Sequence, residues 1–243
     1  MATRVVCIFD ANGQSSGENV PDHTASFVAW ERADNGITFD TLRVNASFAQ
    51  QQAALYASNS TSILDQTVPS FAYISLATLV GETTAKALIV EAATYINALT
   101  APYKSTLQRQ IVFLQQYPEV VAQIEFFTYD GLLAPFSTVT RSPNKTYSTF
   151  LACQQHLLSR GTVHINSKMA SDYPIINPNY YTVPFDFKVA TAGIAYMRKI
   201  GATPQFSAIF GTEVTPGQCR TILLPSVLVP SFTQSARPRW RRR

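Results

Sequence analysis

The sequence predicts an α+β fold in which an antiparallel sheet is covered by helices. Strand-like segments with alternating or continuous apolar residues are separated by turn signals, and several longer segments repeat apolar residues at helical spacing. Strands and helices do not alternate one by one as they do in a parallel α/β protein. With 243 residues, 46% apolar and 14% charged, the chain has a globular composition and suffices for one large domain or two small ones.

The strands are expected at residues 24–31, 70–76, 121–129, 150–156 and 161–166. The last three follow one another along the chain, so we expect them to pair as an antiparallel meander. Side chains alternate between the two faces of a strand. One face of the strand at 121–129 therefore carries Gln123, Glu125, Phe127 and Tyr129.

Three helices are expected between these strands. The first, at 39–57, has an apolar stripe of Leu42, Ala46, Phe48 or Ala49, Ala53 and Tyr56. The second, at 84–99, has a stripe of Leu88, Ala92, Tyr95, Ile96 and Leu99. Pro102 separates it from a third helix that carries Leu107, Ile111 and Leu114.

A fourth helix follows a proline-rich crossing at 174–179, which the prolines restrict to extended or turned backbone. Thr182 is expected to cap this helix, and Gly201 to end it in a left-handed conformation. Asp186 lies in the first turn, where the helix dipole favours an anion. The predicted buried stripe consists of Phe187, Ala190, Ile194 and Met197.

The net charge of +4 comes from the C-terminal end. From Gln218 onward there are six arginines and no acidic residue, which leaves 13 basic and 15 acidic residues, a net charge of −2, in the rest of the chain. The arginines could form an arm for nucleic acid or a membrane surface. We favour a terminus without such a function, because no nucleic-acid-reading module accompanies it. We expect the last ten residues not to pack with the domain, whereas the apolar run 222–229 could occupy a groove.

Targeting and modification signals are few. No run of about 18 apolar residues predicts a transmembrane helix, and the N-terminal residues make a poor signal peptide. Three cysteines, Cys7, Cys153 and Cys219, indicate neither a disulfide framework nor a metal site. Three N-glycosylation sequons, at Asn45, Asn59 and Asn144, mildly favour a secretory ancestor.

Motifs that carry catalytic chemistry are missing. The sequence has no G-x-G-x-x-G, no P-loop, no H-E-x-x-H and no G-x-S-x-G. Its three histidines are His23, expected to be buried and hydrogen-bonded, His164, expected at the surface or in packing, and His156, for which no partner is evident.

Two separated motifs resemble the glucose-methanol-choline (GMC) family of flavoenzymes. Residues 159–200 contain S-R-G, then P-I-I-N-P-N-Y, then an aspartate in a helix that ends in R-K-I. Residues 17–23 read G-E-N-V-P-D-H, similar to the family's G-E-N-x-x-D-H. The resemblance covers roughly 13–217. It implies a sheet whose open face covers FAD, and an activity on the CH–OH group of an alcohol or sugar.

This resemblance suggests a division of the chain. Residues 1–23 would be a remnant of the FAD domain, 24–170 the substrate-binding domain, 171–217 the return segment toward the FAD domain, and 218–243 a divergent basic tail. The family's catalytic histidine would be expected beyond Gly217, where this sequence has no histidine. The chain is therefore expected to have no catalytic or cofactor-binding residue of its own and to bind no FAD alone.

Two functions remain open on these grounds. One is a truncated, inactive piece of a GMC oxidoreductase, and the other is a non-catalytic binding or interaction module derived from the same domain. The residues expected to line a substrate pocket for a small alcohol are Phe127, Tyr129 and Phe150, and the alternative is that these rings pack in the core beneath the helices. Neither nucleic acid nor a membrane is expected as a partner, and no metal site is expected.

Overall fold

The computed structural model describes residues 17–34, 36–66, 70–133, 139–167, 169, 171–217 and 228–230. Its centre is an antiparallel sheet with the strand order β2-β3-β4-β1-β7, and β8 lies beside β1 on the side of β7. The strands are β1 (Thr24–Arg32), β2 (Phe71–Ser75), β3 (Ala122–Tyr129), β4 (Tyr147–Gln154), β7 (Phe210–Thr215) and β8 (Leu228–Pro230). The predicted α+β class and antiparallel sheet are confirmed.

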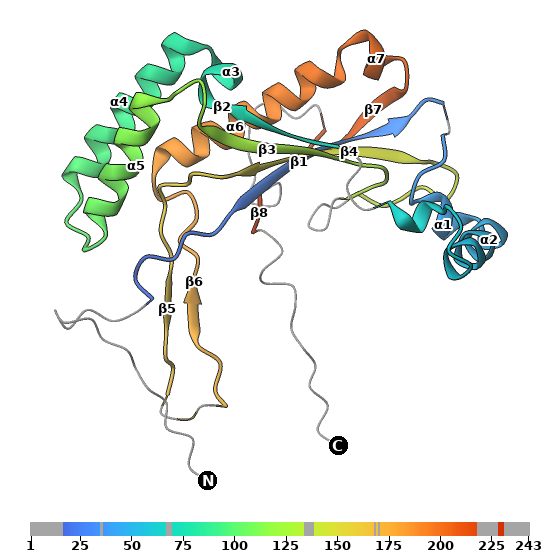
Figure 1. The fold of residues 1–243 in the computed structure, drawn as a ribbon, viewed down its shortest axis with the longest axis horizontal. Coiled ribbons are helices and arrows are strands. Elements are labelled where there is room, and N and C mark those ends of the chain that lie inside the picture. Colours follow the sequence, from blue (N-terminus) through green and yellow to red (C-terminus); the bar gives the residue numbers. More distant parts are fainter. Residues whose placement is uncertain are drawn as a thin grey trace.

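Five helices lie on one face of this sheet (Figure 1). They are α3 (Leu76–Val80), α4 (Glu82–Ala98), α5 (Lys104–Gln116), α6 (Pro184–Gly201) and α7 (Pro204–Ser207). The predicted stripe of α5 is confirmed, since Leu107, Ile111 and Leu114 are all buried. In α4 the buried stripe is Ala85, Ile89, Ala92 and Ile96, so Leu88 and Tyr95 lie at its margin.

Aromatic rings fill the core between the sheet and α6 and α7. Trp30 of β1 stacks on Phe210 of β7 at a centroid distance of 4.8 Å, and Phe150 of β4 meets Trp30 edge to face at 5.1 Å. Phe126 and Phe206 contact Phe150 from the neighbouring strand and from α7. Edge-to-face pairs of this kind add to the free energy gained by burying the rings.

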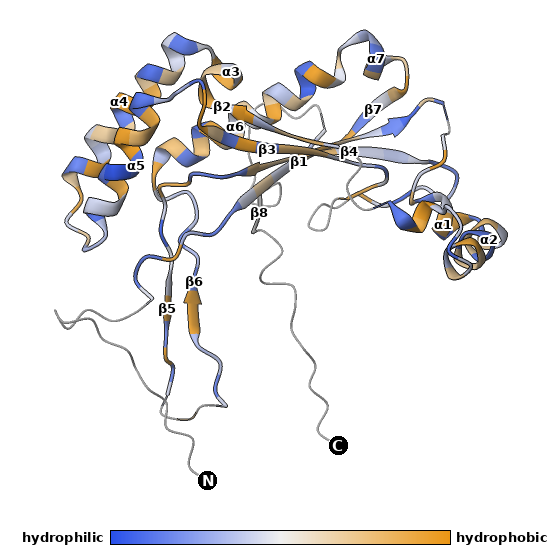
Figure 2. Cartoon of the chain, in the orientation of Figure 1, coloured by the Kyte–Doolittle hydropathy of each residue, from blue (hydrophilic) through white to orange (hydrophobic). Residues whose placement is uncertain are grey.

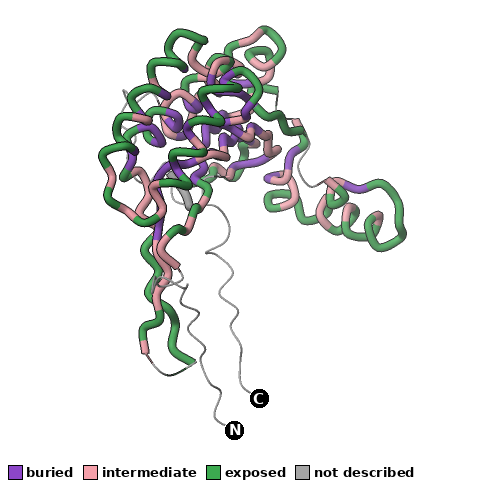
Figure 3. The backbone as a smooth tube through the Cα atoms, turned by 60° about the vertical axis from the view of Figure 1, so that its left-hand side comes forward, coloured by how far each residue is buried: buried purple, intermediate pink, exposed green. Residues whose placement is uncertain are grey.

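The helix predicted at 39–57 is broken at Asn45. It consists of α1 (Thr41–Val44) and α2 (Ala46–Ala57), because Asn45 has extended backbone and its side chain caps α2 by accepting a hydrogen bond from the Phe48 amide. Neither helix buries a residue. With the 3-10 turn η1 (Ile63–Asp65) they form an arm that stands away from the sheet (Figure 3).

The predicted meander is wrong in its third strand. Residues Thr162–His164 form β5, which pairs with β6 (Ile175–Asn177) in a separate two-stranded ribbon that projects from the body (Figure 1). The prolines keep the crossing extended, as predicted, and this extended segment becomes the partner of β5. Figure 2 shows β6 as hydrophobic, although Ile175 and Ile176 are 57% and 52% exposed.

Both predicted ends of α6 need correction. The N-cap residue is Val183, and the Thr182 hydroxyl donates to the Asn179 carbonyl instead of capping the helix. Gly201 is the last helical residue and Ala202 follows in a right-handed conformation. The predicted stripe holds for Ala190, Ile194 and Met197, whereas Phe187 is 41% exposed.

The end of the apolar run does pack with the domain, because β8 pairs with Thr24, Ala25 and Ser26 of β1. The last ten residues lie outside the described part of the chain. None of the described helices combines the length and the hydropathy that spanning a bilayer requires.

Candidate functional site

The face of the sheet opposite the helices carries a row of large apolar side chains. Strand register aligns Phe71 of β2 with Phe127 of β3, Phe127 with Leu151 of β4, and Leu151 with Phe27 of β1. Because side chains alternate along a strand, these four lie on one face, and their neighbours Phe126 and Phe150 belong to the helix-covered core. We call this set the apolar row.

A polar row runs beside it. Tyr73, Glu125, Cys153 and Ala25 are aligned across the same four strands. The Tyr73 hydroxyl donates to Glu125 Oε1 at 3.3 Å, and Gln155 Nε2 donates to Glu125 Oε2 at 3.0 Å. Glu125 is thus fixed between two donors, with one carboxylate oxygen bonded on each side.

Cys153 does not act as a nucleophile in this row. Burial, with a smaller contribution from the nearby Glu125 carboxylate, raises the pKa of its thiol to about 12. A cysteine attacks or ligates as the thiolate, so this side chain stays protonated at neutral pH and contributes packing.

The three predicted pocket residues do not share one face. Phe127 belongs to the apolar row, and Tyr129 lies two residues further along the same face, where its ring stacks on Phe39 at 5.4 Å. Phe150 is aligned with Thr128, so its side chain points to the opposite face, where it is 1% exposed in the aromatic core. The expectation that Phe150 lines a pocket with the other two is therefore wrong in geometry.

The two family-like motifs meet in space, 140 residues apart in the chain. Val20 and Gly161 exchange both backbone hydrogen bonds, at 3.1 and 2.9 Å. The buried Arg160 guanidinium donates to Asn19 Oδ1 at 2.9 Å, and to Gln110 of α5 and the Leu157 carbonyl. One arginine thereby joins the 17–23 motif to the S-R-G segment and to the helix layer.

Asp186 holds the other side of this junction. Its two carboxylate oxygens accept the backbone N–H groups of Leu158 at 2.8 Å and Ser159 at 2.6 Å. Burial raises the pKa of the Asp186 carboxyl, and the hydrogen bonds from Ser159 and Leu158 and the charge of Arg160 oppose that rise. The sequence analysis expected Asp186 to interact with the dipole of α6. In the structure its carboxylate instead binds the backbone amides of residues 158 and 159.

Two glycines allow the close approach at this junction. Gly17 has φ +102°, and a Cβ there would lie 2.1 Å from the Val163 carbonyl oxygen. A Cβ on Gly161 would lie 2.5 Å from the Asn177 carbonyl oxygen. The glycines of both motifs are therefore needed for backbone packing.

Two tyrosines of the N-P-N-Y-Y segment pack against the first motif. The Tyr180 hydroxyl donates to the Asp22 carboxylate. The pKa of both Tyr180 and Tyr181 is raised, first of all by burial, and at Tyr180 also by the Asp22 carboxylate. Both residues are therefore neutral at physiological pH. Tyr180 binds the first motif through its hydroxyl, and the Tyr181 ring packs against Tyr180 and Phe187.

The histidines do not form a catalytic group. His23 is exposed, so the expectation that it is buried is wrong. His156 Nδ1 lies 2.7 Å from the Ala122 carbonyl oxygen, and His164 Nε2 lies 3.1 Å from Glu18 Oε1. Among the described residues, no group of three His, Cys, Asp or Glu side chains could hold a metal ion.

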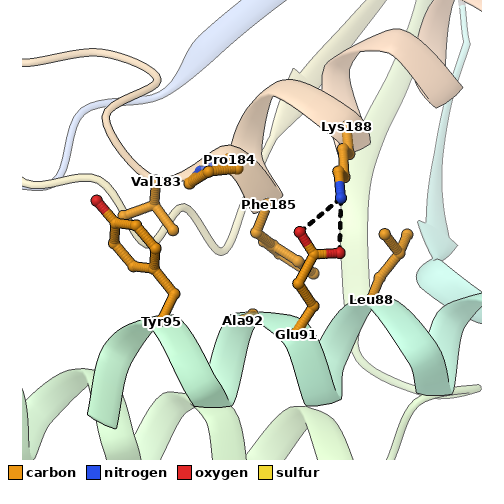
Figure 4. A pocket seen from close by; sticks show the side chains of 8 residues that line it. All are labelled: Leu88, Glu91, Ala92, Tyr95, Val183, Pro184, Phe185 and Lys188. Carbon is orange, nitrogen blue, oxygen red and sulfur yellow. Dashed lines mark hydrogen bonds and ion pairs between the residues drawn. The ribbon is translucent and has the colours of Figure 1, made fainter. Parts of the chain in front are cut away.

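A small hollow lies between α4 and α6 (Figure 4). Lys188 Nζ lies 2.6 Å from each carboxylate oxygen of Glu91 across it, and the Tyr95 hydroxyl donates to the Thr182 carbonyl. Its volume of about 50 Å³ has room for no more than one or two water molecules. The hollow is therefore a small gap in the packing of α4 against α6, bridged by polar groups, and it is too small for a substrate.

Part of the chain is similar to known oxidoreductases. A family model described as GMC oxidoreductase matches residues 158–225. The dehydrogenase mpl7 of Monascus purpureus is 26% identical over 214 residues, which cover 82% of this chain and 34% of the relative. The chain thus spans about a third of the length of this curated relative.

Solved structures share the fold. An FAD-dependent oxidoreductase from Chaetomium thermophilum matches with a TM-score of 0.70 and 20% identity, over 88% of this chain and 37% of that chain. A fungal aryl-alcohol oxidase matches with a TM-score of 0.58 and 20% identity, over 83% and 34%. The helix-backed antiparallel sheet is thus the fold found in flavin-dependent oxidoreductases. This chain is similar to GMC oxidoreductases in residues 158–225 and shares its fold with FAD-dependent oxidoreductases.

The residues described here do not fit FAD by themselves. Every strand pairing among them is antiparallel. A dinucleotide is held by a strand, a glycine-rich turn and a helix N-terminus within a parallel βαβ unit, and the described part of the chain contains no such unit.

Sequence reasoning missed most of the apolar row. Phe27, Phe71 and Leu151 were placed in strands, but nothing local shows that strands so far apart in the chain align them. The available signal was the alternation in 121–129, which gave Phe127 and Tyr129. Phe71, Leu151 and Phe27 join the apolar row only through the registers of β2 with β3, β3 with β4, and β4 with β1.

Proposed function

We propose that the open sheet face is one wall of the substrate cavity of an FAD-dependent GMC oxidoreductase that acts on the CH–OH group of a small alcohol. The observation that carries this proposal is the apolar row on the face away from the helices, where Phe71 is 63% exposed and Phe127 is partly exposed, whereas Phe27 and Leu151 are buried. Aromatic walls suit an aryl or other hydrophobic alcohol. An aryl-alcohol oxidase with the same fold supports this choice.

In this proposal the chain binds and orients the substrate. Phe127 and Tyr129 contact the apolar part of the alcohol, and the Phe127 ring excludes water from that side. FAD, held by other parts of a longer enzyme, supplies the hydride acceptor. None of the described residues is assigned the role of base. His156 contacts the Ala122 carbonyl, His164 contacts Glu18, and His23 is exposed, so none of the three lies in the apolar row.

The chain would then divide as the family resemblance implies. Residues 1–23 belong with the FAD domain, 24–170 form the substrate-binding domain, 171–217 return toward the FAD domain, and 218–243 are a divergent basic tail. The contact between Val20 and Gly161 supports a common exit and return point for the first and third segments. Nucleic acid is not proposed as a partner, because the chain before Gln218 has a net charge of −2.

The wall can be tested by titrating the ¹⁵N-labelled chain with benzyl alcohol and following amide chemical shifts. We expect shifts to concentrate on β3 and on its neighbours β2 and β4. Phe127→Ala should weaken these shifts, while Phe113→Ala, which removes a 46% exposed ring from α5, should leave them unchanged. Shifts confined to the helix layer would contradict the assignment.

The second part of the proposal is that the 243-residue chain does not oxidise alcohols on its own. FAD binding would need contacts that the described residues lack, and proton abstraction needs a base within about 3 Å of the hydroxyl. We expect no quenching of flavin fluorescence when FAD is added, and no turnover of benzyl alcohol or glucose above that of free flavin. A yellow protein with stoichiometric FAD would overturn this part alone.

The alternative is a non-catalytic binding module with the same wall. What favours it is that the apolar row is complete without any group from another domain. The DNA that flanks the coding region separates the two functions. Upstream sequence encoding G-x-G-x-x-G and downstream sequence encoding a histidine-bearing segment would support the oxidoreductase, whereas unrelated flanks on both sides would support the module.

A further inference from the structure

The arm formed by α1, α2 and η1 contains an exposed stretch without charged residues. From Val44 to Leu64 the sequence contains no charged residue. A soluble surface usually has about 25–35% charged residues. Neither α1 nor α2 buries a residue, and Val44, Tyr56 and Leu64 are 51%, 54% and 40% exposed. The arm also stands off the body (Figure 3), so the sheet does not cover it.

All three N-glycosylation sequons of the chain lie at this arm. Asn45 is the N-cap of α2, and Asn59 follows the other end of the helix. Asn144 is 99 residues away from Asn45 in the chain, yet both border one surface hollow of about 640 Å³ that also includes Ile37 and Val44. All three asparagines are exposed.

The local geometry leaves the reacting atoms accessible. Asn45 uses only its carbonyl oxygen, which accepts from the Phe48 amide at 3.0 Å and from the Ser47 hydroxyl at 2.8 Å. Its Nδ2, the atom that carries a glycan, has no bond to another described residue. Asn59 occupies a left-handed turn with φ 55°, which asparagine tolerates. A glycan on either side chain therefore leaves the ends of α2 intact.

We propose that Asn45, Asn59 and Asn144 carry N-linked glycans, which cover the uncharged stretch of the arm from Val44 to Leu64. In the reaction the asparagine Nδ2 forms a bond to C1 of an oligosaccharide and loses one proton. The bond between C1 and the diphosphate oxygen of a polyprenyl-diphosphate donor breaks, and the diphosphate leaves with the electron pair. Glycans are bulky and solubilising, which is what an exposed helix without charge lacks.

To test this, the full chain is expressed in yeast behind a secretion leader, and glycan occupancy is measured at each asparagine of the chain that reaches the lumen. Peptide N-glycosidase F in ¹⁸O-labelled water converts each occupied asparagine into a labelled aspartate that mass spectrometry locates. We expect all three sites to be labelled. Ser47→Ala, Thr61→Ala and Thr146→Val should each lose one glycan mass while keeping the asparagine and, at Asn45, the helix cap.

These hydroxyl variants are mild in structure. Ser47 and Thr61 are exposed, and the Thr146 hydroxyl is buried without a hydrogen-bond partner among the described residues. A chain that reaches the lumen and keeps the mass of the bare polypeptide would overturn the proposal. So would a failure to occupy Asn45 or Asn59, because these two bracket α2.

The covering role has its own measurement. The triple variant without sequons should scatter more light on concentration than the glycosylated chain, and Tyr56→Glu in that variant should restore solubility by charging the arm. Phe113→Glu on α5 is the matched control and should not. If the bare and glycosylated chains stay equally soluble, the glycans do not shield the arm, and that part of the proposal fails.

Discussion

Asp186 is one residue whose sequence context and tertiary role differ. A carboxylate in the first turn of a helix normally interacts with the helix dipole at the surface, but here it is 1% exposed and accepts the amides of Leu158 and Ser159. Removing it would leave two buried N–H groups and the Arg160 guanidinium without this partner. Asp186 therefore stabilises the junction together with Arg160 and the backbone pair of Val20 and Gly161.

We predict that Asp186→Ala lowers the free energy of unfolding by about 2–5 kcal/mol, because buried donors left unpaired cost that much. The measurement is urea unfolding followed by tryptophan fluorescence. The control is Asp172→Ala, an exposed carboxylate, for which a change within about 0.5 kcal/mol is expected. Equal, small effects for both variants would show that the junction is not held by Asp186.

At the scale of the element, α6 is fixed by how closely it approaches the sheet. Two of its glycines face strands at different spacings. A Cβ at Gly201 would lie 2.9 Å from Cζ2 of Trp30, whereas one at Gly193 would lie 3.4 Å from Cβ of Ala152. Trp30 cannot shift readily, because its ring is stacked on Phe210 and meets Phe150.

The two glycine positions should therefore respond to alanine with opposite signs. Gly201→Ala should destabilise by about 1–3 kcal/mol through overpacking. Gly193→Ala should be neutral or stabilise by up to about 1 kcal/mol, since alanine is the better helix former. Thermal unfolding by circular dichroism measures both. A stabilised Gly201→Ala variant would mean that Trp30 has room to move.

At the scale of the whole molecule, stability is concentrated in one layer interface. The buried side chains lie between the main sheet and the helices α3 to α6, while the arm and the β5–β6 ribbon bury few or none. Segments with few buried apolar contacts open at lower free energy than the core. The molecule therefore has one buried core and two projecting parts with little buried surface.

Hydrogen exchange should show this order. We expect amides of β1, β4 and α6 to exchange only with global unfolding, and those of α2 and β6 to exchange much faster, by local opening. Mass spectrometry of peptides from 46–57 and 147–154 compares the two classes directly. Equal protection of α2 and β4 would indicate that the arm is stabilised by contacts beyond those described.

The sequence by itself determined the type of most elements and their class of fold. The helix at Lys104–Gln116, the strands at Thr24–Arg32 and Ala122–Tyr129, and the start of α6 after a proline-rich crossing all follow from local periodicity and backbone restriction. So does the pairing of Phe127 and Tyr129 on one face. These properties depend on neighbours within a few residues, which is the range that a sequence pattern describes.

Only the tertiary structure decided which residues meet. Phe150 belongs to the core because the register with β3 places it opposite Thr128, and β5 leaves the sheet because Asp186 redirects the chain at 158–159 and β6 offers the pairing edge. The apolar row and the contact of Arg160 with Asn19 join segments up to 141 residues apart. Such contacts depend on register and on packing between layers, and no local pattern contains either.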